Sequence, residues 1–218
     1  MSYASLLQGL LDLYEARFAL RWLHWAERLQ HTMDATFWDD ANGGWFNSAA
    51  NAPDIVLRLK EDYDGAEPAP SSVAVMNLLR LGAIFDGASG GTEASSYRTR
   101  ARRGLLAFRT QWQNLPQAMP QMLCALEPVL EPPRHVVLVG DPATADFRAL
   151  AAVVRQTFGR QRAVLAVTGE SDRAWFANRQ PWLADMKPVN GRAAAYVCEE
   201  FTCQAPVTSP EELRRLLG

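Results

Sequence analysis

Apolar residues recur at three- and four-residue spacing over most of the first 130 positions, which is the pattern of amphipathic helices. The first predicted helix covers residues 2–18, with Ser2 as a candidate N-cap. A second covers residues 22–37 and carries His24 and His31 on its polar face. This position favours solvent-exposed histidines over metal ligands or catalytic bases.

Three further helices are predicted in this part of the chain. The third, residues 73–85, is apolar on nearly every face and should therefore be buried on most sides. The fourth covers residues 97–112, and a fifth begins near Pro116 or Pro120. Between the second and third helices, residues 45–47 and 55–59 are candidates for short extended segments.

The predicted helices repeat as pairs, since the pair over residues 2–37 is followed by a similar pair over residues 71–112. Alternation of buried and half-buried helices is typical of an α/α toroid with inner and outer helices, although a plain helical bundle fits the same pattern. We expect a partial α/α toroid of helical hairpins over residues 1–130.

Prolines at positions 128, 132 and 133 end the helical pattern, because proline lacks an amide hydrogen and disfavours helix in the residue before it. Beyond them, residues 136–139, 163–167 and 193–198 are short apolar runs typical of buried strands. Asp141 and Pro142 are the predicted start of a helix that extends to Phe158. The fold class is therefore α plus α/β, with a small three-stranded α/β domain over residues 134–218.

The last helix of this domain has its own start signal, a capping box with proline at the first helical position, in Ser209-Pro210-Glu211-Glu212. The domain does not match a nucleotide-binding fold. Its first strand-to-helix turn has one glycine, Gly140, where the dinucleotide motif needs three. Asp141 would place a negative charge where a pyrophosphate binds.

Composition excludes several classes of function. The formal net charge is −2, which disfavours nucleic-acid binding and membrane-surface binding. We see neither a signal peptide nor a membrane span and expect a cytoplasmic protein without a cofactor. Three cysteines, Cys124, Cys198 and Cys203, are too few for a secreted disulfide scaffold.

The densest group of charged residues lies at residues 60–72, immediately before the third predicted helix. Asp62, Asp64 and Glu67 are candidate catalytic residues, because glycoside chemistry uses two carboxyl groups on either side of a bond. Trp45, Phe46 and Tyr63 are candidates for stacking on a sugar ring, and core packing is the alternative for them. A plain solvated loop is the alternative for the whole segment.

Cys198 is the last residue of the last predicted strand, and Cys203 follows it after four intervening residues. Their spacing differs from the Cys-x-x-Cys motif of oxidoreductases. Inert structural thiols, a disulfide and a metal site all remain open, although a structural zinc would need two more ligands than these cysteines supply. No metal is predicted.

Three segments carry a resemblance to a known family: Asp62-Tyr63-Asp64-Gly65-Ala66-Glu67-Pro68, Val136-Val137-Leu138-Val139-Gly140-Asp141, and residues 195–207, which begin Ala-Tyr-Val-Cys. In this order they resemble the C-terminal part of the spermatogenesis-associated protein 20-like family, also described as thioredoxin-domain-containing proteins. The resemblance implies a longer protein with a thioredoxin-like domain and a toroid similar to N-acylglucosamine 2-epimerases and six-hairpin glycosidases. This chain would be a fragment or a short relative.

Two functions follow as expectations. The first is carbohydrate binding or processing through the acidic segment; epimerisation is disfavoured, because that chemistry uses histidine and the three histidines lie elsewhere. The second is a non-catalytic scaffold that works with a thioredoxin-like partner domain. We also expect a homodimer through residues such as Leu7, Leu11, Trp22 and Trp25, unless the α/β domain covers that helical edge.

Overall fold

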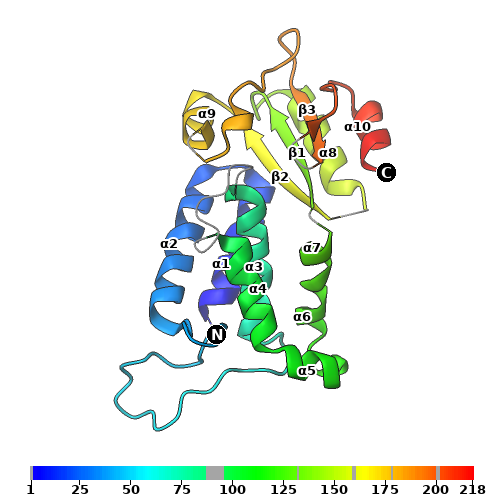
Figure 1. The fold of residues 1–218 in the computed structure, drawn as a ribbon. Coiled ribbons are helices and arrows are strands. Elements are labelled where there is room, and N and C mark those ends of the chain that lie inside the picture. Colours follow the sequence, from blue (N-terminus) through cyan, green and yellow to red (C-terminus); the bar gives the residue numbers. More distant parts are fainter. Residues whose placement is uncertain (1, 87–95, 132, 159–160, 178, 200–201) are drawn as a thin grey trace. The chain divides into compact units, whose positions relative to one another are not determined.

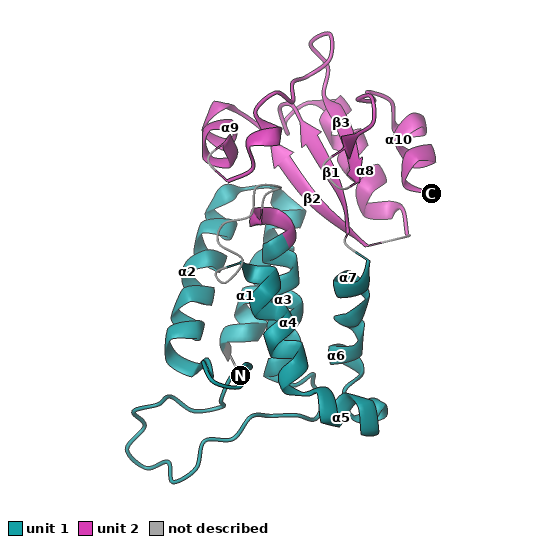
Figure 2. Cartoon of the chain, in the orientation of Figure 1, with its two compact units in different colours: residues 1–82, 90–131 teal, residues 83–89, 132–218 magenta. Residues whose placement is uncertain are grey.

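The computed structural model describes residues 2–86, 96–131, 133–158, 161–177, 179–199 and 202–218 (Figure 1). The chain divides into two units: unit 1 comprises residues 1–82 and 90–131, and unit 2 comprises residues 83–89 and 132–218 (Figure 2). The protein combines helices with one four-stranded sheet, so it is mixed α and β as expected. No described helix is long and apolar enough to cross a membrane.

Unit 1 is helical. Its elements are α1 (Ser2–Arg17), α2 (Leu20–Phe37), α3 (Pro70–Phe85), α4 (Tyr97–Ala107), α5 (Arg109–Asn114), the 3-10 turn η2 (Pro116–Ala118), α6 (Pro120–Cys124) and α7 (Leu126–Leu130). The last residues of α3 belong to unit 2. Helices α1 and α2 form an antiparallel hairpin (Figure 1), and α1 ends because Phe18 adopts a left-handed backbone with φ of 54°.

The core of unit 1 follows the predicted periodicity. Helix α1 buries Leu7, Leu10, Leu11 and Tyr14, and α3 is buried along almost its whole length. Helix α4 approaches α3 closely, since a Cβ added at Gly104 would lie 3.0 Å from Cγ2 of Val75. Burial of Leu7 and Leu11 corrects the expected dimer contacts, because these side chains are already inside the fold.

Two predicted helices of unit 1 are broken into shorter ones. The fourth stops at Phe108, whose φ of −110° and ψ of 17° are not helical, and resumes as α5. The fifth is divided into η2, α6 and α7, and prolines start the first two of these. The extended segments expected between α2 and α3 do not form strands: residues 46–69 contain neither helix nor strand, and Trp45 makes a single bridge to Trp38.

Unit 2 contains the sheet, with strand order β2-β1-β3-β4. Its strands are β1 (Arg134–Val139), β2 (Arg162–Val167), β3 (Ala194–Glu199) and β4 (Thr202–Cys203). β1 is parallel to β2 and antiparallel to β3, and β3 is antiparallel to β4. The three predicted strands are confirmed, but the sheet has a fourth, two-residue strand that the sequence pattern did not indicate.

The helical elements of unit 2 are α8 (Ala145–Gln156), α9 (Glu170–Ala177), the 3-10 turn η3 (Pro181–Leu183) and α10 (Pro210–Leu217). The predicted cap of α10 is confirmed, because Oγ of Ser209 accepts a hydrogen bond from the Glu212 amide at 3.1 Å. The predicted limits of α8 were wrong. Asp141 belongs to a turn before the helix, where it accepts from the Ala143 amide, and Phe158 lies beyond the end of the helix with its side chain exposed.

Gly140 has a packing role rather than a phosphate-binding one. Its φ is +145°, and an added Cβ would lie 2.9 Å from Cβ of Ala193. Asp146, in the first turn of α8, also contacts Ala193, because its Oδ2 accepts a hydrogen bond from the Ala193 amide at 2.7 Å. Hydrogen bonds from the Thr144 side chain and then from the Ala193 amide lower the pKa of Asp146 to about 2.

Candidate functional site

The acidic segment is fixed at its start by an ion pair. Lys60 Nζ lies 2.8 Å from Oδ2 of Asp39, a buried carboxylate that also accepts from the amides of Ala41 and Asn42. The hydrogen bond from Lys60 holds the pKa of Asp39 well below its usual range. Burial of the carboxylate acts in the opposite direction, and the hydrogen bonds from Asn42 and Ala41 lower the pKa further. Asp39 therefore organises the turn after α2 and ties it to the acidic segment.

The same turn requires glycine. Gly43 has a φ of +75°, and an added Cβ would lie 2.6 Å from the Arg103 carbonyl oxygen. Lys60 also donates to the Gly43 carbonyl oxygen. The turn, Lys60 and helix α4 are thus packed against one another without room for a side chain at position 43.

Asp64, one of the three predicted catalytic carboxylates, is bound to backbone amides. Its Oδ1 accepts from the Ala69 amide at 2.7 Å, and its Oδ2 accepts from the amides of Gln121 and Met122 at 2.9 and 3.3 Å. The residue is 8% exposed, and its own amide donates to the Ala118 carbonyl oxygen. These bonds cap the first turn of α6 and join it to the acidic segment, so Asp64 has a structural role.

The other two predicted catalytic carboxylates lie at the surface. Asp62 is exposed and accepts from the Gln111 side-chain amide at 3.2 Å, while Glu67 is exposed and its carbonyl oxygen accepts from the Gly65 amide. Asp64 points into the fold, whereas Asp62 and Glu67 are accessible to solvent. The three carboxylates therefore lie in two different environments, one buried and two exposed.

The predicted stacking residues Trp45, Phe46 and Tyr63 differ in exposure, and Phe46 is half-buried. Tyr63 is 61% exposed. Trp45 is buried, packs edge to face with Trp38, and donates from Nε1 to Oδ1 of Asp34 at 2.8 Å. Asp34 also accepts from Arg100 at 2.6 Å. Trp45 is therefore a core residue, as the alternative interpretation held. It is also one of the residues that line a pocket.

That pocket, in unit 1, is the best candidate for a ligand site. Its cavity volume is about 70 Å³, and it lies where the first turns of α1 and α3 meet the end of α2 and residues 45–47. It is lined by Tyr3, Ala4, Met33, Phe37, Trp45, Phe46, Asn47, Glu61, Pro70, Ser71 and Ala74. Glu61 is the one carboxylate among these lining residues. An apolar wall with a few polar groups is typical of small-molecule sites.

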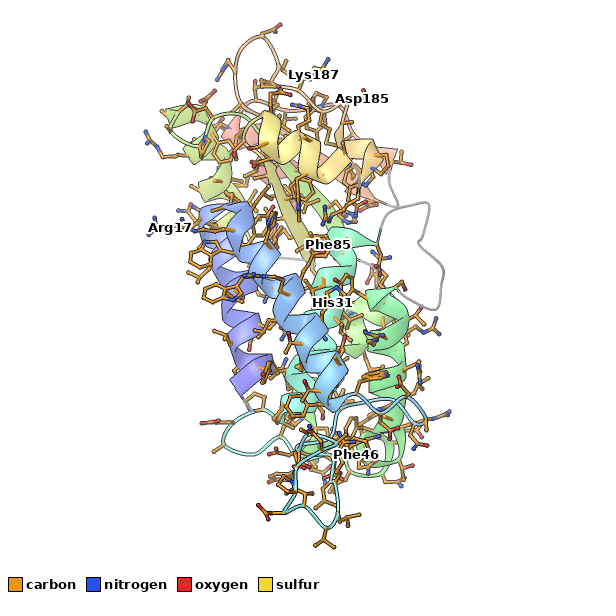
Figure 3. The ribbon with its side chains drawn as sticks, turned by 90° about the vertical axis from the view of Figure 1, so that its left-hand side faces the viewer. Arg17, His31, Phe46, Phe85, Asp185 and Lys187 are labelled. Carbon is orange, nitrogen blue, oxygen red and sulfur yellow. A yellow bond between two sulfur atoms is a disulfide. The ribbon has the colours of Figure 1, made fainter. Side chains whose placement is uncertain are left out.

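Phe46 connects this pocket to two cations. The Arg58 guanidinium carbon lies 4.0 Å from the centre of the Phe46 ring, and Lys60 Nζ lies 5.1 Å from it. Arg58 is itself held by a hydrogen bond from Nε to the Ser48 carbonyl oxygen. Phe46 lies among the loop segments at one end of the helices of unit 1 (Figure 3). The sequence indicated Phe46 as an aromatic candidate but did not single out Arg58 or Glu61, because the association of these three residues depends on the fold of residues 45–61.

Two of the three histidines lie on α2 and the third lies on β1. His24 and His31 are exposed on α2, as predicted, and Figure 3 labels His31 on that helix. His135 is buried in β1, where Nε2 lies 2.8 Å from the Ala83 carbonyl oxygen. None of the three is among the residues that line the pocket.

Cys198 and Cys203 are joined by a disulfide, with an S–S distance of 2.11 Å and a Cα–Cα distance of 3.9 Å. Of the three interpretations left open by the sequence, the structure contains the disulfide. Cys124 is an exposed free thiol. Within the described ranges, no three His, Cys, Asp or Glu side chains are grouped so that they could hold a metal ion.

Comparison with known proteins supports the family resemblance. Over 217 residues, 99% of this chain, the sequence is 39% identical to human spermatogenesis-associated protein 20 and 38% identical to the mouse protein of that name. An uncharacterized protein of Caenorhabditis elegans is 32% identical over 216 residues. The chain covers 26% of the two mammalian proteins and 28% of the nematode protein, about a quarter of their length. No family model matches the chain.

Proposed function

For this homologue of spermatogenesis-associated protein 20, we propose that the helical unit binds a carbohydrate in the pocket bordered by Trp45, Phe46 and Glu61. The observation that carries the proposal is the combination of aromatic walls with one carboxylate in a single pocket. Aromatic rings pack against the apolar face of a sugar, and a carboxylate accepts hydrogen bonds from its hydroxyl groups.

The size of the cavity limits the ligand. A volume of about 70 Å³ holds a few water molecules and is smaller than the roughly 150 Å³ cavity that accommodates a benzene ring. One substituent of a sugar ring, such as a hydroxymethyl or acetamido group, fits this space while the ring rests on the rim. Exposed Asp62 and Glu67 belong to the same acidic segment as Glu61 and are available to a larger glycan.

Binding is better supported than catalysis. A glycoside hydrolase needs two carboxyl groups that flank one bond, at about 5 to 10 Å from each other. Asp64 accepts three backbone hydrogen bonds, which favours a structural role over a catalytic one. We include in the proposal a partial α/α toroid similar to those of N-acylglucosamine 2-epimerases and six-hairpin glycosidases, which the α1–α2 hairpin supports.

A non-catalytic scaffold is the second candidate, and one observation favours it. Ile55, Val56, Leu57 and Leu59 are all exposed apolar side chains on the segment before Lys60. Apolar side chains gathered on a surface mark interaction sites. A thioredoxin-like partner domain, as implied by the family resemblance, would bind there without any sugar.

A titration with mono- and disaccharides, followed by protein NMR or calorimetry, tests the first candidate. Glu61→Gln should weaken binding by about 1.5–3 kcal/mol, roughly tenfold or more, because it removes a charged hydrogen-bond acceptor. Phe46→Ala should also weaken it, and Phe158→Ala is the matched control because Phe158 is an exposed phenylalanine of unit 2. If no sugar binds, or if Glu61→Gln and Glu67→Gln bind sugar equally well, the carbohydrate proposal is wrong.

A further inference from the structure

The sheet of unit 2 places a histidine and both disulfide cysteines in one row. His135 on β1 is the direct cross-strand partner of Cys198 on β3, and Cys198 is the direct partner of Cys203 on β4. Directly opposed residues of antiparallel strands project their side chains to the same face of a sheet. We propose that this row is a thiol–disulfide exchange site, in which an external dithiol reduces the Cys198–Cys203 bond and His135 assists its cleavage.

The two sulfurs differ in accessibility. Cys203 lies on β4, the exposed two-residue strand at the edge of the sheet, whereas Cys198 is fully buried. An external thiolate can therefore reach the sulfur of Cys203, and the sulfur of Cys198 is the leaving group. This division matches what exchange requires, since the reaction rate depends on which sulfur is attacked and on how readily the other leaves.

His135 neighbours the leaving sulfur and is held in one orientation. Its Nε2 lies 2.8 Å from the Ala83 carbonyl oxygen, which can only accept, so Nε2 carries a hydrogen. The ring packs edge to face on Trp182, whose Nε1 donates to Oε1 of Gln180, and Gln180 donates to the Ile84 carbonyl oxygen. In the neutral ring Nδ1 is the basic nitrogen, and its protonation produces an imidazolium beside Cys198.

The reaction proceeds in two balanced steps. The thiolate of the external dithiol attacks the sulfur of Cys203, a mixed disulfide forms, and the Cys198–Cys203 bond breaks with its electron pair on the sulfur of Cys198. The imidazolium of His135 stabilises that thiolate and supplies its proton. The second thiol of the dithiol, after losing its proton, attacks the partner sulfur of the mixed disulfide and releases Cys203, which is protonated from water. Two electrons and two protons pass from the dithiol to the cysteine pair.

A purely structural role accounts less well for this bond. The cysteines are five residues apart and belong to a hairpin that is already joined by ladder hydrogen bonds, including Gln204 N to the Val197 carbonyl oxygen at 3.0 Å. Cross-links that close short loops remove the least entropy from the unfolded chain.

Other charged groups near the row have partners of their own. Arg134 and Glu199 form an ion pair at the neighbouring positions of β1 and β3, so alternation of side chains places them on the opposite face. Among the residues that the structure describes, the charged side chains on α9 and at positions 83–86 and 179–183 are Asp86, Glu170, Asp172, Arg173 and Arg179. Glu170 forms an ion pair with Arg173, Asp172 accepts from Thr168, Arg173 donates to the carbonyls of Ala184 and Met186, and Arg179 lies over Trp175. We therefore assign the pH dependence of the reaction to His135 and the thiols.

The test uses the full chain with Cys124→Ser, which removes the exposed free thiol. Dithiothreitol should reduce the disulfide in the folded protein, and the rate, followed by alkylation and mass spectrometry across a series of pH values, should show an inflection that comes from the histidine. His135→Gln keeps a donor for Ala83 but removes the basic nitrogen. It should lose that inflection and slow reduction by roughly threefold or more, because the leaving sulfur of Cys198 then lacks a neighbouring imidazolium. His31→Gln, at an exposed histidine of α2, is the matched control.

A second measurement keeps the proposal testable if His135→Gln does not fold. In Cys198→Ser, glutathione disulfide should form an adduct on Cys203, whereas in Cys203→Ser the buried Cys198 should react far more slowly. Equal rates and pH profiles for His135→Gln and His31→Gln would overturn the role of His135. A disulfide that dithiothreitol reduces only in denaturant, or two cysteines that remain free thiols after treatment with an oxidised dithiol, would overturn the exchange site itself.

Discussion

Replacing Asp64 tests whether the most buried carboxylate of the acidic segment supports the fold or a reaction. Asp64→Ala removes an acceptor from three backbone amides, those of Ala69, Gln121 and Met122, of which Ala69 and Met122 are buried. Loss of a helix cap costs about 1 kcal/mol, and a hydrogen bond to a charged acceptor contributes about 1.5–3 kcal/mol. Because such contributions are not additive, we expect a total loss of about 3 kcal/mol.

The assay is thermal and urea unfolding followed by circular dichroism. For a chain of this size, a loss of about 3 kcal/mol lowers the Tm of the transition that reports unit 1 by roughly 6–12 °C. The stability of Asp64→Asn should lie between those of the wild type and Asp64→Ala. Its amide oxygen still accepts a hydrogen bond, but its NH₂ group faces a backbone N–H, and two donors cannot bond to each other. Asp62→Asn is the control, since Asp62 is exposed and bonded at 3.2 Å to Gln111; it should change stability by less than about 0.5 kcal/mol.

The structural role of Asp64 is refuted if Asp64→Ala and Asp62→Asn unfold at the same temperature. It is also refuted if Asp64→Asn keeps full stability but loses all carbohydrate binding. That second result would return Asp64 to the catalytic or binding role that the sequence pattern indicated.

Three further predictions concern unit 1. The folded-state pKa of Asp39 lies below its unfolded value, so the Lys60–Asp39 pair stabilises the fold above the unfolded pKa of about 3.9 and loses this effect as pH falls towards the folded pKa. The stability of Asp39→Asn should therefore depend less on pH below pH 4 than that of the wild type. An identical dependence on pH would contradict the pairing. Gly43→Ala should lower the free energy of unfolding by about 1–3 kcal/mol, because position 43 has a positive φ and a Cβ would lie 2.6 Å from the Arg103 carbonyl oxygen. Gly9→Ala is the control, since Gly9 lies within α1 and an added Cβ would have nothing within 4 Å. It should raise the free energy of unfolding by about 0.5–1 kcal/mol in the same assay. The expected dimer should use exposed Leu6, Leu13 and Trp25 rather than Leu7 and Leu11; analytical ultracentrifugation should show a dimer that Trp25→Ala dissociates, and a monomer of 24.2 kDa for the wild type would refute it.

The sequence alone was sufficient for features that depend on neighbouring residues. Apolar spacing located α1, α2 and α3, apolar runs located β1, β2 and β3, and the capping box located the start of α10 at Ser209. Helical periodicity, strand burial and capping all act within a few positions along the chain, so the interacting groups are close together in the sequence. The family resemblance rests on the same kind of contiguous segment.

The roles of the site residues depended on contacts between distant positions. Asp64 is structural because the amides of Gln121 and Met122 reach it across 57 and 58 residues, and Trp45 is a core residue because Asp34 accepts its indole hydrogen. The row of His135, Cys198 and Cys203 exists only through the register of three strands. A carboxylate, an indole or a thiol has the same intrinsic chemistry in every sequence, and only the tertiary structure decides which donors, walls and neighbours surround it.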